Sequence, residues 1–573
     1  MATTLPRTGV VIVGVGAAGG VAALPLAEAG IDVVGVEAGP WLSTRDMAPD
    51  ELRLQRGVWP PGPQKVDGEV PTSRPNPAAN TTRGANHPMM NGVGGTAMHY
   101  MAQAWRLNPW DFRVVSETTR RYGASRIPAG STVEDWPLSY EDLEPSYDRV
   151  EYELGVSGTA GNLNGKIIET GNVFEGPRRR EYPMPALRSS GFMDRMSSAA
   201  QSLGLHPFTG PAAITSRPYE GRPACVYHGF CIGAGCHVNA KSSPAVSTIP
   251  KAQKTGRFNV VAEAHVTRIE VGRDGRAAGV AYIKGGEEFL QPADVVLLAS
   301  HTYENVRLLL LSTSPAFPFG LSNNHRQVGQ HYFSHAQGGG LTALFPFDLR
   351  NWYGTPGQGI CVDDWADDNF DHGGLDFVGG GTMYVYSERR PLAAVNGLGA
   401  WGRSGPNWGS DWKAHVVKNV DRTNGAYMQR TTLPYEGNYL DLDPATRDPL
   451  GNPVIRITAS YRDNEEKIGT FVGEKMRQWY MAAGAVQVQG SGTVNAGAAM
   501  GPSTHAYGGT RMGHNPDTNV VDQWGMSHEV PNLGIMGGSV MGTSGARNPT
   551  LTLQALAWRT ADHVARNWKT IVK

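Results

Sequence analysis

The sequence predicts an α/β fold with two unlike domains, one built on a parallel sheet and one on a large, mainly antiparallel sheet with helices. A β-branched run over residues 9–13 is followed by a glycine-rich turn, an Ala/Leu-rich helical segment and a second apolar strand. Residues 338–461 are rich in Gly, Trp, Tyr and Asp, and alternating segments such as TMYVYS indicate a broad sheet beside a cavity. At 573 residues the chain is too long for one core, so two or more domains are expected.

The first turn, GVGAAGG, supplies Gly14, Gly16 and Gly19 between a strand and a helix, and the acidic Glu37 ends the next strand. This is the order of a Rossmann-type dinucleotide-binding unit, in which the acid follows about 20 residues after the turn. The glycines let the backbone approach a pyrophosphate at a helix N-terminus, and Glu37 can accept hydrogen bonds from a ribose hydroxyl. The alternative is a tight strand-to-helix turn that holds no ligand.

Other segments give a coarse secondary structure. Residues 49–87 are rich in Pro, Asn, Arg and Gly and predict an irregular loop or lid. The segment STVEDWPLSYEDLEPSYDRVEYELGV, from Ser131, has the capping signals and spacing of helices. From Phe258, three alternating segments predict strands joined by turns, and YENVRLLLLS, from Tyr303, returns to helix.

Composition excludes several classes of function. A formal net charge of −1 and a pI of about 7.0 offer no basic surface for nucleic acid. No uninterrupted apolar run reaches the roughly 18 residues of a transmembrane segment. The N-terminus is apolar enough to suggest a signal peptide, but it lacks a twin-arginine start and has the spacing of a nucleotide-binding turn. The chain by itself is therefore expected to be cytoplasmic.

Four motifs carry a resemblance to a known family: GVGAAGG, NGVGG from Asn91, VVLLASHTYENVRLLLLS from Val295, and a C-terminal region that begins with THAYGGTRMG. They occur in family order across nearly the whole chain, and the sequence thereby resembles the glucose–methanol–choline (GMC) oxidoreductases, which bind FAD. Ser300 departs from the pattern, since many members have glycine there. Sugar dehydrogenases look closest, especially the flavoprotein subunit of gluconate 2-dehydrogenase, and pyranose oxidases are a more distant match.

The resemblance implies how the chain is divided and which residues bind FAD. It implies a discontinuous FAD-binding domain over residues 1–48, 88–110, 215–335 and 500–573, and a substrate-binding domain over residues 111–214 and 336–499. The cofactor-binding residues that it implies are Gly14, Gly16, Gly19, Glu37, Asn91, Gly94, Gly95, Thr96, His99, Val266, Gly538, Ser539, Pro549 and Thr550. Val266 is equally consistent with an ordinary buried strand residue. His99 stands where pyranose oxidases carry a histidine linked covalently to the flavin, and a free histidine would give the same sequence.

His505 and Asn548 match the family's catalytic histidine and asparagine. Oxidation of an alcohol removes a hydroxyl proton and a hydride from one carbon, and the isoalloxazine of FAD accepts the hydride. Imidazole has an ordinary pKa of about 6.5, so neutral His505 can take the proton, while Asn548 can hydrogen-bond the same oxygen. The alternatives are a loop histidine beside a glycine turn and a turn or helix-cap asparagine.

The predicted activity is FAD-dependent oxidation of a primary or secondary alcohol on a sugar, sugar acid or glycoside. An oxygen-using oxidase and a noncatalytic flavoprotein that relays electrons are the alternatives. Relatives in sugar dehydrogenase complexes imply a small subunit and a cytochrome or quinone acceptor. They also imply a second location, the periplasm, reached with a signal-bearing partner subunit.

Three of the four cysteines, Cys225, Cys231 and Cys236, lie within twelve residues. Their spacing matches neither the paired cysteines of a zinc site nor a C-x-x-C redox motif. Three cysteines could hold three corners of a [3Fe–4S] cluster, as in some bacterial sugar dehydrogenases of this family. His228 stands where those members commonly have a further cysteine, which favours simple packing in a glycine-tight loop, and a disulfide between Cys225 and Cys231 is a third interpretation.

Overall fold

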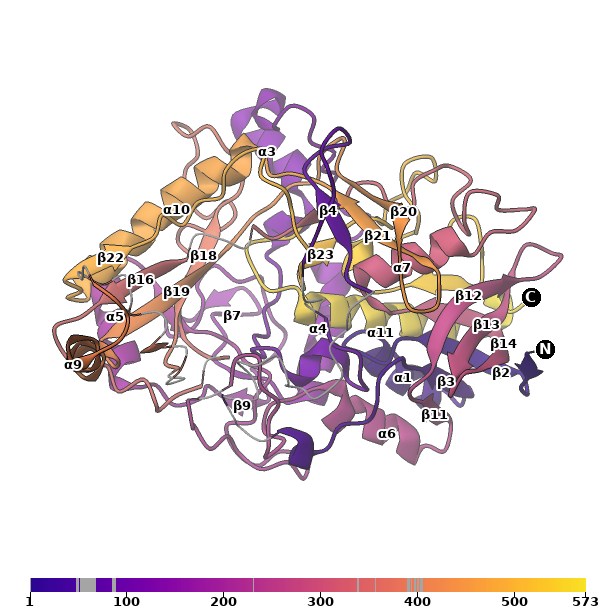
Figure 1. Cartoon of the computed structure of the whole chain (residues 1–573), viewed down its shortest axis with the longest axis horizontal. Helices are drawn as coiled ribbons and strands as arrows, with labels where there is room; N and C mark the ends of the chain where they lie inside the picture. The colour runs from indigo at the N-terminus through magenta and orange to yellow at the C-terminus, as the bar shows by residue number, and fades with distance from the viewer. Residues whose placement is uncertain are drawn as a thin grey trace.

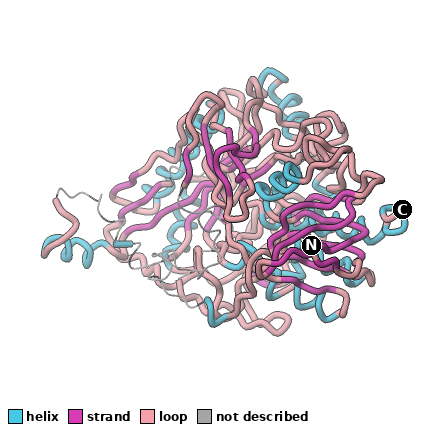
Figure 2. Tube along the Cα trace, turned by 45° about the vertical axis from the view of Figure 1, so that its right-hand side comes forward, coloured by secondary structure: helices cyan, strands magenta, loops and turns pink. Residues whose placement is uncertain are grey.

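The computed structural model describes residues 2–47, 51, 69–84, 89–229, 231–336, 340–355, 357–388, 392, 394–395, 398, 401 and 405–573. Its largest sheets lie at opposite ends of the molecule (Figure 1), and the strands form separate groups in the turned view of Figure 2. Within the described ranges, no helix combines the length and the apolar character needed to cross a membrane.

The first sheet is mainly parallel and forms the centre of the dinucleotide-binding domain. Its strands, in spatial order, are β11 (Phe258–Val261), β3 (Val33–Val36), β2 (Thr8–Val13), β14 (Glu287–Leu298), β13 (Ala277–Lys284) and β12 (His265–Val271). β1 (Thr3–Thr4) and β24 (Leu533–Ile535) also pair with β14. The apolar run of β2 is buried, as expected for a central parallel strand covered on both faces.

Helices pack in a layer beside this sheet. The layer contains α1 (Gly19–Glu28), α4 (Tyr140–Leu154), α6 (Thr248–Lys254) and α11 (Thr550–Arg566), with α1 and α4 both against α11 (Figure 1). The predicted helix after Ser131 is present as α4, and it begins at a capping box in which Ser139 and Asp142 exchange hydrogen bonds.

The second large sheet is antiparallel throughout. Its order is β10 (Pro207–Thr209), β17 (Ile360–Val362), β18 (Gly381–Val385), β19 (Thr423–Arg430), β16 (Leu341–Leu344) and β22 (Gln487–Gln489). α5 (Gly191–Ser202) and α10 (Asp463–Ala482) pack on one face. Met383 and Val385 belong to the core under these helices, whereas Tyr384 and Tyr386 belong to a cluster on the other face. The expected α/β fold with an antiparallel second sheet is therefore confirmed.

A third sheet corrects part of the sequence interpretation. It orders β20 (Tyr439–Arg447), β21 (Pro453–Thr458), β4 (Thr72–Arg74) and β5 (Thr82–Arg83), and β20 and β21 pack on α7 (His301–Leu311). β4 and β5 fall within the predicted irregular excursion, so that prediction is wrong for them, because β4 pairs with β21. Residues 49–50, 52–68 and 85–87 of the excursion lie outside the described residues. The domain division expected from sequence places β20 and β21 in the substrate-binding domain. Both strands contact α7, a helix of the FAD-binding domain.

The remaining regular elements are short or lie at the periphery. They are α3 (Val114–Tyr122), α9 (Ser410–Asn419), α12 (Trp568–Ile571), β6 (Ser157–Gly158), β7 (Asn162–Leu163), β8 (Lys166–Ile167), β9 (Met184–Pro185), β15 (Phe333–Ser334) and β23 (Ala506–Tyr507). The antiparallel pair of β15 and β23 matters most for function, because the residues that flank it face each other.

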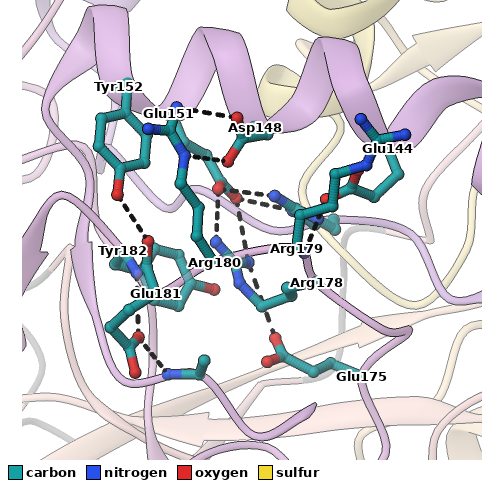
Figure 3. A network of polar contacts seen from close by, with 12 residues as sticks. Glu144, Asp148, Glu151, Tyr152, Glu175, Arg178, Arg179, Arg180, Glu181 and Tyr182 are labelled. Atoms are coloured by element: carbon teal, nitrogen blue, oxygen red, sulfur yellow. Dashed lines mark hydrogen bonds and ion pairs between the residues drawn. The ribbon is translucent and has the colours of Figure 1, made fainter. Parts of the chain in front are cut away.

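A buried ion network fastens α4 to the segment that follows it (Figure 3). Both carboxylate oxygens of Glu151 accept hydrogen bonds from two guanidinium groups, those of Arg106 and Arg178. Burial alone raises the pKa of Glu151, but the two arginines outweigh it and lower the pKa below its ordinary value. More exposed pairs surround this centre, such as Arg180 with Asp148 at 2.8 Å.

Candidate active site

A cavity of about 840 Å3 is lined by residues of both large sheets. This volume falls in the usual range for a pocket that takes a cofactor or a small molecule. The predicted site residues that line it are Gly14, Gly16, Glu37, Asn91, Gly95, Thr96, His99, Val266, His505, Gly538, Asn548, Pro549 and Thr550. Gly19, Gly94 and Ser539 lie behind this wall and do not line it.

The glycines of the first domain allow two loops to approach each other. A Cβ on Gly19, at the start of α1, would lie 2.0 Å from the carbonyl oxygen of Gly14. Gly95 has a φ of +57°, and a Cβ there would lie 2.8 Å from the Cα of Gly16. Only glycine fits these positions without moving the backbone, so the turn after β2 and the loop after Asn91 form one continuous surface of the cavity.

Glu37 holds this surface together. Its Oε2 accepts a hydrogen bond from the backbone N–H of Val15 at 2.9 Å, and its Oε1 accepts from Gly39 at 3.0 Å and Gly92 at 3.1 Å. The sequence predicted a ribose contact for Glu37. The structure adds that the same carboxylate joins the turn after β2 to the loop that contains Asn91.

The geometry of the cavity suits a dinucleotide that carries a flavin. α1, α7 and α11 all begin at its wall, where unpaired backbone N–H groups and the helix dipole favour phosphate oxygens. Glycines supply a wall without side chains next to α1, as close approach of a pyrophosphate requires. The residues present therefore fit FAD.

His505 and Asn548 meet at the same cavity. The Nδ2 of Asn548 lies 3.4 Å from the Nε2 of His505, and both side chains keep part of their surface on the cavity. Burial lowers the pKa of His505 well below its ordinary value, and His335 and His301 lower it further. A lowered pKa keeps the imidazole neutral near pH 7, as a proton acceptor requires.

The segment that carries Asn548 is anchored by a second buried ion cluster. Arg547 donates through Nη1 to Asp367 at 2.6 Å and through Nη2 to Asp363, and Asp111 lies 4.0 Å away. Burial raises the pKa values of Asp111 and Asp367 despite the nearby guanidinium. Sequence reasoning missed this cluster, because the carboxylates lie far from Arg547 in the chain and no local pattern joins them.

Ser300, the departure from the family pattern, has a structural role. Its N–H and Oγ both donate to the Oδ1 of Asn305 at 2.9 Å. The Nδ2 of Asn305 in turn donates to the carbonyl oxygen of Met536 at 2.9 Å and to the Oγ of Ser539 at 3.1 Å. Ser300 thus helps to fix the loop before the C-terminal helix. The adjacent His301, with a φ of +75°, lines the cavity and was not predicted from sequence.

The wall formed by the second sheet is aromatic. Tyr384, Tyr386 and Tyr427 line the cavity, and their rings are stacked with centroids 5.4 to 6.0 Å apart. Tyr384 and Tyr386 are buried, whereas Tyr427 is 47% exposed. The alternation in TMYVYS indicated a strand beside a cavity, but nothing in the sequence brought Tyr427 next to it.

The described residues of the cysteine loop give no sign of a metal site. Among the described residues, no group of three His, Cys, Asp or Glu side chains is placed to hold an ion, so the predicted [3Fe–4S] cluster is not supported. The Sγ of Cys225 lies 3.3 Å from the Oγ1 of Thr355, and the Sγ of Cys236 accepts from the N–H of Lys241. Burial raises the pKa of the Cys231 thiol to about 11, which keeps it protonated. All three cysteines are free, so the disulfide interpretation is wrong and packing fits best.

These features define the class of an oxidoreductase that passes electrons from a CH–OH group to a bound flavin. Family models described as GMC oxidoreductase match residues 131–337 and 434–557. The chain belongs to the GMC oxidoreductase family and is an FAD-dependent enzyme that acts on CH–OH donors.

Three characterised relatives match over nearly their whole length. The chain is 32% identical to a gluconate 2-dehydrogenase flavoprotein of Pantoea cypripedii, over 99% of this chain and 95% of the relative. It is 28% identical to a 2-methyl-1,2-propanediol dehydrogenase of Mycolicibacterium austroafricanum, over 100% of this chain and 98% of the relative. It is also 28% identical to a fructose dehydrogenase large subunit of Gluconobacter japonicus, over 98% of both chains. The crystal structure of pyridoxine 4-oxidase from Mesorbium loti shares the fold, with a TM-score of 0.59 and 14% identity over 97% of this chain and 99% of that one.

Proposed function

We propose that the protein oxidises a primary or secondary alcohol carbon of a sugar, sugar acid or glycoside, with His505 as the base. The observation that carries this proposal is the pair of His505 and Asn548 in a cavity that is also lined by a stack of tyrosines. The pair supplies the chemistry, and the wall supplies a surface for the substrate.

The roles of the two side chains follow from their atoms. Neutral His505 takes the hydroxyl proton of the substrate on Nε2, the ring nitrogen that lies toward Asn548. Asn548 hydrogen-bonds the same substrate oxygen and holds the alcohol in place while negative charge develops on it. The glycines and Glu37 that line the cavity would hold FAD, and bound FAD would accept the hydride that leaves the same carbon.

The tyrosine wall supports a carbohydrate as substrate. Flat aromatic rings suit the C–H faces of a sugar ring, and their hydroxyl groups suit its edge. The cavity is also lined by Gln103, Thr342 and Gln429, whose side chains can both donate and accept hydrogen bonds. A mostly apolar pocket with a few polar groups that fix orientation is the usual form of a small-molecule site.

Two relatives with sugar or sugar-acid names favour this substrate class, and a third is named for a short diol. The test is therefore an anaerobic comparison of sugars, sugar acids, glycosides and short diols, with bleaching of the flavin absorbance as the readout. We expect bleaching by at least one carbohydrate and little or none by the diol. Bleaching by the diol alone would reject the carbohydrate while leaving the alcohol chemistry intact.

The base is tested by the variant His505→Ala. Loss of the imidazole should leave FAD bound and slow flavin reduction by a factor on the order of 10² or more. His514→Ala is the matched control, because His514 is exposed and does not line the cavity. Near-normal reduction in His505→Ala would reject the assignment of the base, whereas a wild-type flavin that no alcohol bleaches would favour a flavoprotein that only relays electrons.

The electron acceptor decides between a dehydrogenase and an oxidase. We favour a dehydrogenase, in line with the three relatives named as such. Mixing the substrate-reduced enzyme with air and, separately, with a quinone distinguishes the two. Faster reoxidation by oxygen than by the quinone would make the protein a sugar oxidase.

The covalent link between His99 and FAD stays a prediction. His99 lines the cavity, and burial lowers its pKa to about 4 with a further contribution from Lys241, so its ring is neutral. Acid precipitation tests the link: yellow colour in the protein pellet would support it. Colour only in the supernatant would show that FAD is held without a covalent bond.

The partner subunits and the location also stay predictions. One relative is named as a large subunit, which favours a small subunit here, and the cytochrome or quinone acceptor rests on the family resemblance alone. Fractionation of the native host, with and without the neighbouring subunit, separates a cytoplasmic protein from a periplasmic one carried by a partner. A cytoplasmic protein that purifies alone would reject the complex.

A further inference from the structure

A second buried histidine, His335, lies directly across from His505. β15 and β23 pair antiparallel, with Ser334 opposite Ala506, so the next pair along the ladder is His335 and His505. The backbone N–H of His335 donates to the carbonyl oxygen of His505 at 3.2 Å. The register of this short ladder therefore brings the two imidazoles together, with ring centroids 5.1 Å apart.

Hydrogen-bond partners determine which nitrogens of the two rings carry protons. The Nε2 of His335 lies 2.9 Å from the carbonyl oxygen of Gly545. A carbonyl oxygen can only accept, so this Nε2 carries the proton. Burial lowers the pKa of His335 to about 4, so the ring is neutral near pH 7 and its Nδ1 is an acceptor.

The acceptor atom Nδ1 of His335 determines which ring nitrogen of His505 carries the proton. Their Nδ1 atoms lie 2.9 Å apart, so the Nδ1 of His505 must be the donor. Because His505 is also neutral, its Nε2 then has no proton. The Nδ2 of Asn548, 3.4 Å from this Nε2, is a donor, which agrees with a bare lone pair there.

Two features hold His335 in this role. Its partner Gly545 lies three residues before Asn548, so one short segment supports both ends of the hydrogen-bonded path. The hydroxyl of Tyr507 lies 3.2 Å from the Nδ1 of His335. Burial raises the pKa of Tyr507 well above its ordinary value, so this hydroxyl keeps its proton and shares the lone pair of that Nδ1 with the closer N–H of His505.

We propose that His335 is a positioning residue that sets the tautomer of His505 and so leaves Nε2 as the atom that takes the substrate proton. The proposal rests on the proposed function, because it concerns the same base. His335 itself is buried and does not line the cavity. Its effect therefore reaches the substrate only through His505.

Three variants of His335 separate the tautomer role from simple packing. His335→Asn keeps an acceptor near the position of Nδ1, His335→Gln keeps a donor toward Gly545, and His335→Phe keeps the ring shape but neither group. We expect flavin reduction to fall about 10- to 100-fold in His335→Phe, by analogy with metal-bound histidines that lose the partner orienting the ring. His335→Asn should recover most of this loss and His335→Gln little. FAD content and substrate affinity should stay near wild type in all three.

A spectroscopic measurement tests the tautomer without any turnover. In holoenzyme labelled with 15N in the histidine rings, protonated and bare nitrogens give well-separated signals, and His505→Gln identifies the signals of His505. We expect a protonated Nδ1 and a bare Nε2 in wild type, and a mixture of tautomers in His335→Phe. His514→Phe, at an exposed position, is the control for the effect of removing one histidine.

The outcomes separate this proposal from the proposed function. A bare Nδ1 on wild-type His505, or an unchanged tautomer in His335→Phe, would overturn the role of His335. Equal losses of activity in the Asn, Gln and Phe variants would also overturn it and leave only packing. If no carbohydrate reduces the flavin, the proposed substrate fails, but the ring-nitrogen signals still decide the tautomer.

Discussion

The buried ion clusters around Glu151 and around Arg547 have opposite arrangements of charge. In the first, one carboxylate, Glu151, is held between two guanidinium groups. In the second, one guanidinium, that of Arg547, is held between two carboxylates, with Asp111 as a third nearby. The pKa of Glu151 is lowered, whereas those of Asp111 and Asp367 are raised.

This difference decides how each cluster responds to a loss. A guanidinium keeps its charge at every pH that a protein survives, so Arg106 and Arg178 stay charged when Glu151 is lost, with only Glu144 and the more distant Glu175 left beside them. Carboxyl groups can take up protons, so the Arg547 cluster can relieve an imbalance. The residues of the Glu151 cluster do not line the cavity, and they fasten α4. The Arg547 cluster lies next to the cavity, because Arg547 directly precedes Asn548 in the chain.

The largest loss of stability is expected for Glu151→Gln. It leaves the guanidinium groups of Arg106 and Arg178 buried without their shared carboxylate, and breaking a buried pair in this way costs about 3–5 kcal/mol. Urea unfolding should show this loss, while the flavin reduction rate of the folded protein stays near wild type. Asp148→Asn is the control: it breaks a half-exposed pair with Arg180 and should cost no more than about 1 kcal/mol. Equal losses in the two variants would remove the distinction between buried and exposed pairs.

Arg547→Met should destabilise the protein less at acidic pH than at alkaline pH. Unlike Glu151→Gln, it should also reduce activity. The loss should approach about 3 kcal/mol at pH 8 and shrink toward pH 5, because the freed carboxyl groups take up protons. Flavin reduction should fall at least about 10-fold, since Asn548 loses the support of its neighbour. Urea unfolding at the two pH values and stopped-flow reduction check both effects. A stability loss that does not depend on pH would contradict the idea that this cluster adapts.

The smallest effect is expected for Asp111→Asn. The folded pKa of Asp111 is raised above its unfolded value of about 3.9, so wild type loses stability as pH rises from that value toward the folded pKa. The amide resembles the protonated acid and should change the free energy of unfolding by no more than about 1 kcal/mol at pH 5. Above that pH the variant should lose less stability than wild type. Parallel pH curves for the two proteins would show that Asp111 is ionised in the folded state.

Much of the first domain could be predicted from local sequence. The glycine turn, the strand that ends at Glu37 and the helix α4 each carry a signal within one or two dozen residues, and each is present. His505 and Asn548 could be named from motifs, and the structure brings them to one cavity.

The parts that could not be predicted depend on pairing between distant segments. β4 is a strand because it pairs with β21, several hundred residues later in the chain. His335 meets His505 through the register of a ladder only two residues long on each side, which has no hydrophobic pattern of its own. The carboxylates that pair with Arg547 lie at residues 363 and 367, separated from it by 184 and 180 residues of chain.

The hydrogen-bonded path behind His505 has a consequence for where protons go. It runs from the Nδ1 of His505 through His335 and ends on the carbonyl oxygen of Gly545. An amide oxygen does not hold a proton near neutral pH, so this path cannot carry a proton from His505 toward the protein interior. A proton captured on the outer nitrogen of His505 is therefore stored there, and it departs only by way of the cavity, along the route that the substrate itself must use.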